Sequence, residues 1–532
     1  MDSDTKRSQE DTRLDEFKKN YLSKSHSEEK IELIELISNE FPEKGDSFLI
    51  DKFKREKDWK VRKKIIEAVA KGNIKEAIPF FIEALGDTNM KIKEAAITLL
   101  GKAEAVESIQ PLINMLQYGK AEYYDVLISN IVKISKKVDI NEVTKYIHEG
   151  SIYIKRAIPI ILGKIGNKDA EDTLKSLIND PNPTVRKNSV IALEKLIDEP
   201  DEINIILNTL NDGDIEVKKA AIWLLGNLGD KRALKPLSEL LKDQEEEIRR
   251  ATVKSLQKLL TTFKTFKIIY DIIKKRNVLA RREAVKLLGL IGHQSPQAIK
   301  TLIRLLNSKD SAIRRLSFSG ILKIFRSEQS VSEKTNILEL ILLSLKAKEP
   351  LIRKNCAKIL GRIGDDRVIE PLLVLLNDSK AGVRRAATDS LARFGNSRVI
   401  LIASQFLEDP DWKLRRSIVR LLIRISKQDE ALRDEALEPL TKCFKDEDRY
   451  IKTWALKALG KLKTINNIDP FVEMLNDDDP KIRIAAVKGL AKIGDKDAIK
   501  PLSNALADDN WDVRKEIEKA LEKIEPDWMN FI

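Results

Sequence analysis

The stretch RVIEPLLVLLNDSKAGVRRAATDSLARFG, residues 367–395, reads as two short helices joined by a polar turn. The first helix is predicted by apolar residues at the spacing of one helix face, Val368, Leu372, Leu375 and Leu376. The segment NDSKAG then interrupts this pattern with residues that favour turns and helix caps.

A second helix follows the turn. Its predicted buried face carries Val383, Ala387 and Leu391, and Gly395 is a candidate C-cap. Neither helix is long enough to be stable alone, and each has a single apolar face. We therefore expect the pair to be stable only where neighbouring copies bury those faces.

The same pattern recurs along the chain, which indicates an array of stacked helical repeats. An aliphatic residue followed by a basic one marks the second helix of each copy, and we number that helix from the aliphatic residue, position i. Most copies are 31 or 32 residues apart, and a degenerate copy at Tyr123 fills the one double gap. About fifteen copies are predicted, at Val61, Ile92, Tyr123, Ile154, Val185, Val217, Ile248, Ala280, Ile313, Ile352, Val383, Leu414, Ile451, Ile482 and Val513.

Four features recur in register: a Pro-Leu pair in the first helix, an aspartate in the turn, a Val/Ile-Arg pair, and an ALG or LLG ending of the second helix. Together they resemble the HEAT-repeat family, particularly the short form found in phycobilisome-lyase-like proteins. The resemblance implies an all-α, right-handed α-α superhelix, an α-solenoid of HEAT/armadillo-like repeats. We expect a polar N-terminal tail and helical cap at 1–43, the solenoid at 44–524 and a C-terminal tail at 525–532.

The resemblance also implies a ladder along one edge, in which turn aspartates pair with the basic residues at i+1. Arg384 is expected to pair with such aspartates, Asp378 among them. The ladder should lapse where Lys275, Ser308 and Ala347 replace the aspartate. The expected ladder aspartates are Asp87, Asp180, Asp212, Asp243, Asp378, Asp409, Asp446, Asp477 and Asp508.

Two segments, RSEQSVSEKT at 326–335 and SKQDEALRD at 426–434, lengthen the connection that leaves the second helix. Passive length variation explains them most simply, because surface connections tolerate insertions. Partner-binding loops are the alternative.

No catalytic constellation is visible, and we predict neither a metal site nor a cofactor. The three histidines, His26, His148 and His293, lie far apart without metal-ligand spacing. Related di-iron hydroxylases use several His-Glu pairs, whereas this chain has one, at 148–149. Cys356 and Cys443 have no histidine near them in sequence to activate the thiol. A HEAT-like lyase or oxidoreductase is therefore an alternative without supporting residues.

The composition favours a protein of a reducing compartment. The chain has 532 residues, two cysteines and a net charge of +12, and two distant cysteines argue against a disulfide framework. The polar N-terminus lacks the apolar core of a signal peptide, and no apolar run is long enough for membrane insertion. We expect a cytoplasmic protein, and the pattern gives no oligomeric state.

The positive charge is concentrated on the second helices, which line the concave face in HEAT solenoids. Helical geometry places i, i+4, i+7, i+8 and i+11 in the core, and i+2, i+6, i+9 and i+13 toward the groove. Basic residues occupy i+2 in nine successive copies and i+6 in several of them. The predicted concave basic track consists of Arg156, Lys187, Lys219, Arg250, Arg282, Arg315, Lys354, Arg385 and Arg416 at i+2, with Lys254, Lys286, Lys358 and Arg420 at i+6.

Three interpretations of this track stay open. It would suit a non-catalytic scaffold or adaptor that holds an acidic protein segment. It would also suit a nucleic-acid backbone, with Trp223 at i+6 as a candidate stacking residue. Alternatively, the track is only repeat consensus, since Lys and Arg are good helix formers. Trp59, Trp412 and Trp511 precede the repeat starts by two residues, where we expect them to pack between repeats.

Overall fold

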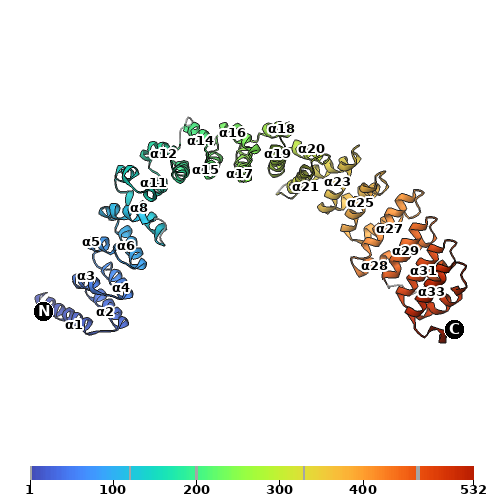
Figure 1. Cartoon of the computed structure of the whole chain (residues 1–532), viewed down its shortest axis with the longest axis horizontal. Helices are drawn as coiled ribbons and strands as arrows, with labels where there is room; N and C mark the ends of the chain where they lie inside the picture. The colour runs from blue at the N-terminus through green and yellow to red at the C-terminus, as the bar shows by residue number, and fades with distance from the viewer. Residues whose placement is uncertain (1–2, 119–121, 198–201, 328–329, 463–467, 532) are drawn as a thin grey trace. The chain divides into compact units, whose positions relative to one another are not determined.

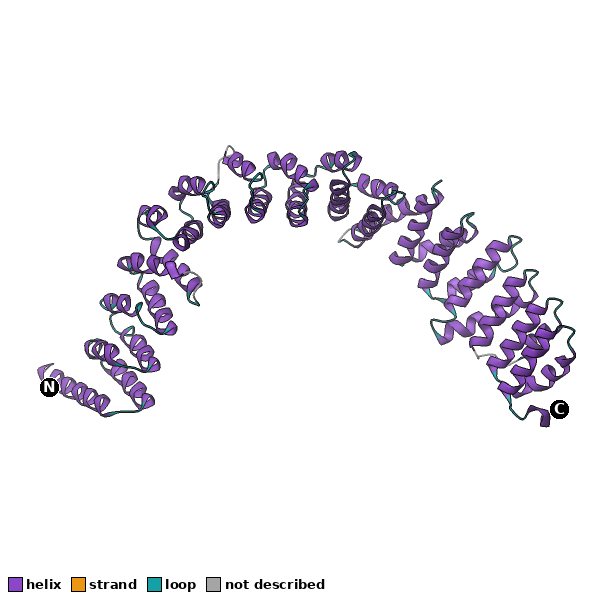
Figure 2. Ribbon diagram, in the orientation of Figure 1, coloured by secondary structure: helices purple, strands orange, loops and turns teal. Residues whose placement is uncertain are grey.

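The computed structural model describes residues 3–118, 122–197, 202–327, 330–462 and 468–531, and within these ranges its regular structure is entirely helical. Figure 2 shows helices joined by short loops. None of the described helices combines the length and apolar character that a membrane span requires. The chain divides into two compact units, Met1–Phe263 (unit 1) and Lys264–Ile532 (unit 2).

Each repeat contributes a first helix, the A helix, and a second helix, the B helix. The B helices of unit 1 are α4 (Trp59–Val69), α6 (Met90–Ala103), α8 (Tyr124–Ser135), α11 (Ile152–Ile165), α13 (Pro183–Ala192), α15 (Ile215–Leu228) and α17 (Glu246–Phe263). Those of unit 2 are α19 (Val278–Ile291), α21 (Ser311–Arg326), α23 (Pro350–Ile363), α25 (Ala381–Phe394), α27 (Trp412–Ile425), α29 (Arg449–Leu462), α31 (Pro480–Ile493) and α33 (Trp511–Ile524).

The A helices are mostly shorter, and several continue into a single 3-10 turn. In unit 1 they are α3 (Asp46–Arg55), α5 (Ile78–Ala84), α7 (Ile109–Met115), α9 (Asn141–Thr144) with α10 (Tyr146–Glu149), α12 (Glu171–Leu177), α14 (Ile203–Thr209) and α16 (Leu234–Glu239). In unit 2 they are α18 (Lys267–Lys274), α20 (Pro296–Leu305), α22 (Val331–Leu343), α24 (Ile369–Val374), α26 (Ser397–Ser404), α28 (Glu430–Lys442), α30 (Asp469–Glu473) and α32 (Ile499–Asn504).

The core lies between the A and B layers of each unit, as the repeat pattern predicted. All fifteen residues used to number the B helices are buried, from Val61 to Val513 and including Tyr123 of the degenerate copy. Positions i+4 and i+8 are buried in every copy as well. Consecutive B helices such as α23 and α25 pack side by side. Gly395 caps α25 with a φ of 44°, a left-handed conformation that favours glycine.

The glycine of the LLG ending lies inside the B helix, at i+9, where it meets the next B helix. A Cβ at Gly361 would lie 2.4 Å from the Cβ of Ser390, and one at Gly226 would lie 2.6 Å from the Oγ of Ser255. Ser390 Oγ also donates to the carbonyl of Ala357 on the neighbouring helix at 2.8 Å. The expectation that i+9 faces a groove is therefore wrong, because this position is the close-approach point between B helices.

The predicted edge ladder is present in part, because six of the nine expected aspartates pair with the basic residue at i+1. The carboxylates of Asp180, Asp243 and Asp409 make no such pair among the described residues. Arg353 donates through Nε and Nη2 to both carboxylate oxygens of Asp378 in the next turn, at 2.6 and 3.1 Å. Its Nη1 donates to two carbonyls of its own turn. Arg384 likewise donates through Nη1 to two carbonyls of its own turn, those of Asp378 and Ser379. The carboxylate of Asp378 belongs to Arg353 of the preceding copy, which corrects the expected pairing of Arg384. Equivalent ion pairs join Arg62–Asp87, Arg186–Asp212, Arg415–Asp446, Lys452–Asp477 and Arg483–Asp508.

The ladder lapses in the middle repeats. Ser308 stands where Arg281 would meet an aspartate, and the Nε of Arg281 is buried with no hydrogen-bond partner among the described residues. Arg314 donates to the two carbonyls of residues 308 and 309, and the turn that follows it carries Ala347. The boundary between the two units lies shortly before Lys275. Of the three turns that lack an aspartate, the one at Lys275 therefore lies close to the division of the chain.

The two insertions lengthen A helices more than loops. Both α22 and α28 have 13 residues, whereas α24 has 6. Ser330 and Glu333 form a capping box that starts α22. Residues 328–329 of the first insertion lie outside the described residues.

Helices also occupy both ends of the chain. The first two helices are α1 (Ser3–Ser23) and α2 (Ser27–Glu40), and α2 buries Ile34 and Ile37 and packs against α4. At the other end, a 3-10 turn at Trp528–Phe531 contacts α32 and α33.

Candidate interaction surface on the B helices

The B helices form a layer of their own, so their outer faces make a repeated surface. In unit 1, α4, α6, α15 and α17 lie along one side and α3, α5, α14 and α16 along the other (Figure 1). The predicted basic residues at i+2 divide between the units, from Arg156 to Arg250 in unit 1 and from Arg282 to Arg416 in unit 2.

Three of the nine residues at i+2 bind the residue that begins the next B helix. Arg282 Nε donates to Asp310 at 2.8 Å, and Arg416 Nη2 donates to Asp448 at 2.6 Å. Arg156 makes a longer bond, 3.4 Å, to Asn182. These acceptors also cap the next helix by accepting from its first backbone N–H groups. The three basic residues therefore form a second set of contacts between repeats.

Two further residues at i+2 are paired with glutamates. Lys219 binds Glu216 at 2.6 Å and Glu247 of the next repeat at 2.7 Å. Arg250 binds Glu246 one turn earlier at 2.6 Å, with both side chains largely exposed. Exposed pairs of this kind contribute little to stability, but they lower the net charge of the surface.

The remaining basic residues at i+2 and i+6 are the free part of the track. No hydrogen bond or ion pair to another described residue holds the side chains of Lys187 and Lys254 in unit 1, or of Arg315, Lys354, Lys358 and Arg385 in unit 2. Lys286 makes a 3.6 Å contact with Glu283 on its own helix. Arg420 lies over the ring of Trp454 and has no carboxylate partner among the described residues.

A third basic row, at i+10, was missed from the sequence. Most copies carry Lys or Arg there, near the end of the B helix. A positive charge near a helix C-terminus interacts favourably with the helix dipole. In unit 2 this row follows i+2 and i+6 along the same helix face, and one of its members, Arg424, pairs with Asp389 at 2.5 Å. A search for a recurring charge at every repeat position would have found Lys71, Lys102, Lys133, Lys164, Lys195, Lys258, Lys323, Arg362, Arg393, Arg424, Lys461, Lys492 and Lys523.

The tryptophans before the repeat starts behave differently from one another. Trp59 lies under Lys91 of the next repeat, with the ammonium 4.9 Å from the ring centroid, as expected for packing between repeats. Trp412 and Trp511 are instead 44% and 61% exposed. Much of each ring therefore lies in solvent and not between repeats as expected. Trp223 at i+6 is also exposed.

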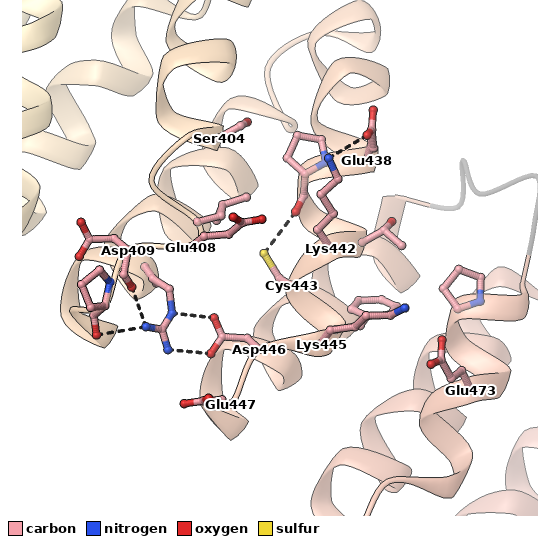
Figure 3. Close-up of a pocket in the computed structure, with 17 residues that line it drawn as sticks. Ser404, Glu408, Asp409, Glu438, Lys442, Cys443, Lys445, Asp446, Glu447 and Glu473 are labelled. Carbon is pink, nitrogen blue, oxygen red and sulfur yellow. Dashed lines mark hydrogen bonds and ion pairs between the residues drawn. The ribbon is translucent and has the colours of Figure 1, made fainter.

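A separate groove of about 1050 Å³ lies among the A helices of unit 2 and the turns that follow them (Figure 3). It is lined by residues of α26, α28 and α30, and the ladder pair Arg415–Asp446 lies at its edge. Cys443 lines it, with the thiol donating to the carbonyl of Pro439 at 3.3 Å. None of the predicted basic track lines this groove.

The reactive residue types do not converge on a site within the described part of the chain. No group of three His, Cys, Asp or Glu residues with metal-binding geometry occurs there. Burial raises the pKa of the Cys356 and Cys443 thiols to about 12. Neither thiol is therefore ionised at neutral pH, which a cysteine nucleophile requires.

Stacked helix pairs with a turn aspartate–arginine ladder define the class of HEAT-repeat solenoids. The family described as HEAT repeats matches residues 47–125, 140–212, 203–264, 337–403, 400–469 and 468–527, which is well over half of the chain. The chain belongs to the HEAT-repeat family.

Several solved structures are similar to this chain at low sequence identity. Kap95p bound to RanGDP is 12% identical over 96% of this chain and 82% of its own, with a TM-score of 0.43. Kap121p is 10% identical over 98% and 84%, with a TM-score of 0.32. An engineered protein is 18% identical over 68% and 99%, with a TM-score of 0.24. No curated protein sequence matches the chain.

Proposed function

We propose that this HEAT-repeat protein is a non-catalytic scaffold or adaptor that binds an acidic protein partner on its B-helix surface. The observation that carries the proposal is a set of uncompensated basic residues on four consecutive B helices of unit 2, α21 to α27. We call this set the unit-2 basic face. It consists of Arg315, Lys354, Lys358, Arg385 and Arg420, with Lys323, Arg362 and Arg393 at i+10.

Negative charge on the same positions is sparse. Across i+2, i+6 and i+10 of these four helices, Asp389 is the single carboxylate, and Arg424 already neutralises it. A surface with unbalanced charge of one sign favours partners of the opposite sign and speeds their encounter. In unit 1, Lys187 and Lys254 are also basic and unpaired. Of the paired residues in the two units, Arg156, Lys219, Arg282 and Arg416 bind residues of the next repeat, whereas Arg250 binds Glu246 of its own helix.

An acidic protein segment fits this face better than a nucleic acid does. Proteins that follow single strands present aromatic platforms on which successive bases stack. Helices α21, α23 and α25 contain neither Trp nor Tyr, and α27 contains a single Trp, Trp412, so the face lacks a row of Trp or Tyr platforms along its length. An acidic protein surface can place its carboxylates to suit basic residues spaced by the helix separation of roughly 8–10 Å.

The finer features of the proposal rest on the repeat length, the cysteines and the histidines. The 31- or 32-residue repeat supports the short, phycobilisome-lyase-like form of the HEAT repeat. The two cysteines are free and buried, which supports a reducing, cytoplasmic setting. The buried thiols and scattered histidines support a binding role over a lyase or oxidoreductase.

The test combines Arg315→Glu, Lys354→Glu and Arg385→Glu in one protein. Its matched control, Lys300→Glu with Arg304→Glu and Lys500→Glu, makes the same change in net charge at exposed positions on A helices. Fluorescence anisotropy would measure binding of a labelled Asp/Glu-rich peptide and of a labelled oligothymidylate. Because exposed ion pairs contribute about 0.2–1 kcal/mol each, and reversal adds repulsion, we expect the triple variant to weaken peptide binding about tenfold or more.

The control should bind the peptide like the wild type. Equal affinities of the triple variant and the control for the peptide would refute the proposal. Tight binding of the oligothymidylate without binding of the peptide would instead favour the nucleic-acid alternative.

A further inference from the structure

At the C-terminal side of the unit-2 basic face, Arg416 is held between two aromatic rings. Its Cζ lies 4.2 Å from the ring centroid of Trp412 on the same helix and 4.5 Å from that of Tyr450 on the next B helix. The ion pair with Asp448 fixes the same guanidinium from a third side. Arg416 is therefore a structural residue that positions the two rings.

One turn along α27, Arg420 is stacked but not neutralised. Its Cζ lies 4.4 Å from the ring centroid of Trp454, and no described carboxylate binds it. Burial and the nearby positive charges of Arg385, Arg416 and Arg384 lower its pKa. Stacking limits the conformations of a guanidinium, so less freedom is lost when it binds an oxyanion. Arg420 is therefore an oriented cation without a counterion.

The groups around Arg420 combine free positive charge with exposed aromatic rings. Arg384 is occupied by two backbone carbonyls of its own turn, whereas Arg385 is exposed and has no ion-pair partner among the described residues. Trp412 and Tyr450 remain 44% and 46% exposed although they stack on Arg416. Exposed Trp and Tyr rings beside free arginines are the residue types that dominate binding energy at protein interfaces.

We propose that Arg385, Arg420, Trp412, Tyr450 and Trp454 form an anchoring site, the aromatic–arginine site, for the acidic partner. Arg420 and Arg385 bind a carboxylate of the partner, and an aromatic or large aliphatic side chain beside that carboxylate packs on the exposed rings of Trp412 and Tyr450. The proposal rests on the proposed function and adds the partner's motif, an Asp or Glu next to a large apolar residue.

The test uses two labelled acidic peptides that differ only in having Phe or Ala between the acidic residues. Fully burying a phenylalanine side chain is worth about 1.5–3 kcal/mol, so the wild type should prefer the Phe peptide about tenfold or more. Trp412→Leu should remove this preference and leave binding of the Ala peptide unchanged. Trp412→Phe, which keeps an aromatic face, should retain it.

Trp511→Leu is the matched control, because Trp511 occupies the equivalent position in the last repeat, is exposed, and carries Lys515 over its ring. This control should keep the preference for the Phe peptide. Arg420→Gln should weaken both peptides several-fold, while Arg304→Gln on an A helix should weaken neither. Circular dichroism would check that each variant is folded.

The outcomes separate the two proposals. If both peptides bind the wild type equally, and the triple variant of the basic face still weakens both, the anchoring site is refuted and the basic face stands. If neither peptide binds the wild type, the proposed function itself fails. A preference that survives Trp412→Leu would also overturn the anchoring site.

Discussion

Arg384 and Arg385 are adjacent in sequence, yet only Arg384 is hydrogen-bonded to its own repeat. Arg384 donates to two carbonyls of its own turn, and Arg385 has no ion-pair partner among the described residues. The residue after the repeat start pairs with the next turn's aspartate in six copies, among them Arg353 and Arg415, which confirms the predicted ladder in part. The next residue cannot be assigned from one repeat alone, because its partner lies 26 to 32 residues away in the next turn.

The sequence held a usable signal for those partners. Arg282 and Arg416 are paired because Asp310 and Asp448 begin the next helix, whereas Lys354 has Lys380 at that position. Comparing i+2 with the residue three before the next repeat start would have found these two pairs, but it would not have identified every free residue. Arg385 has Asp411 at that position and Lys187 has Asp214, and neither basic side chain has an ion-pair partner among the described residues.

Removal of a ladder arginine should destabilise unit 2. Arg353 and Asp378 are 14% and 7% exposed, so Arg353→Ala would leave a nearly buried carboxylate without its cation. We expect a loss of about 2–4 kcal/mol in the free energy of unfolding. Urea denaturation followed by circular dichroism would measure it. Arg385→Ala is the control and should change stability by less than about 0.5 kcal/mol.

The ladder should also make stability depend on acid pH. Burial alone would raise the pKa of Asp378, but the hydrogen bonds from Arg353 and from the backbone N–H of Lys380 outweigh it and lower that pKa. A carboxyl with a lowered pKa stabilises the fold above its unfolded pKa of about 3.9 and loses that contribution as pH falls through the folded value.

We therefore expect unfolding free energy to drop as pH falls below about 4. Arg353→Ala should make this drop shallower, because Asp378 would then have a more ordinary pKa. Identical pH profiles for the wild type and Arg353→Ala would contradict a stabilising role for this pair.

At the scale of the elements, the spacing of B helices is set by glycines inside them. The LLG ending suggests the end of a helix, but Gly361 lies within α23 and meets Ser390 of α25. Single-repeat patterns could not reveal this, since the contact is between copies. The two insertions likewise read as loops, although about half of their residues belong to α22 and α28.

A methyl group at the close-approach point should push two B helices apart. We expect Gly361→Ala to cost about 1–3 kcal/mol, because its Cβ would overlap Ser390. Gly382, in the first turn of α25, has open space around it apart from a 4.0 Å approach to Lys354. Gly382→Ala should therefore be neutral or stabilise by up to about 1 kcal/mol. Thermal unfolding of the two variants would measure the difference, and equal costs would contradict the close-approach interpretation.

At the scale of the whole molecule, the repeat number and the helical layers follow from the sequence because every copy buries the same positions. The division into two units has a weaker signal, the run of Lys275, Ser308 and Ala347 in place of ladder aspartates. Function is less visible than fold, because repeat consensus and a binding surface both place basic residues at i+2. Whether each basic residue at i+2 is paired in the folded structure distinguishes a structural role from a binding role.

The central claim is that charge on the unit-2 basic face selects the partner, and a charge-swap experiment tests it most directly. The measurement is the affinity of an Asp/Glu-rich peptide and of its Lys-substituted counterpart for the wild type and for the variant with Arg315→Glu, Lys354→Glu and Arg385→Glu. We predict that the wild type prefers the acidic peptide, that the variant loses this preference or prefers the basic one, and that rising salt weakens both effects. The same preference for the acidic peptide in both proteins would contradict the account.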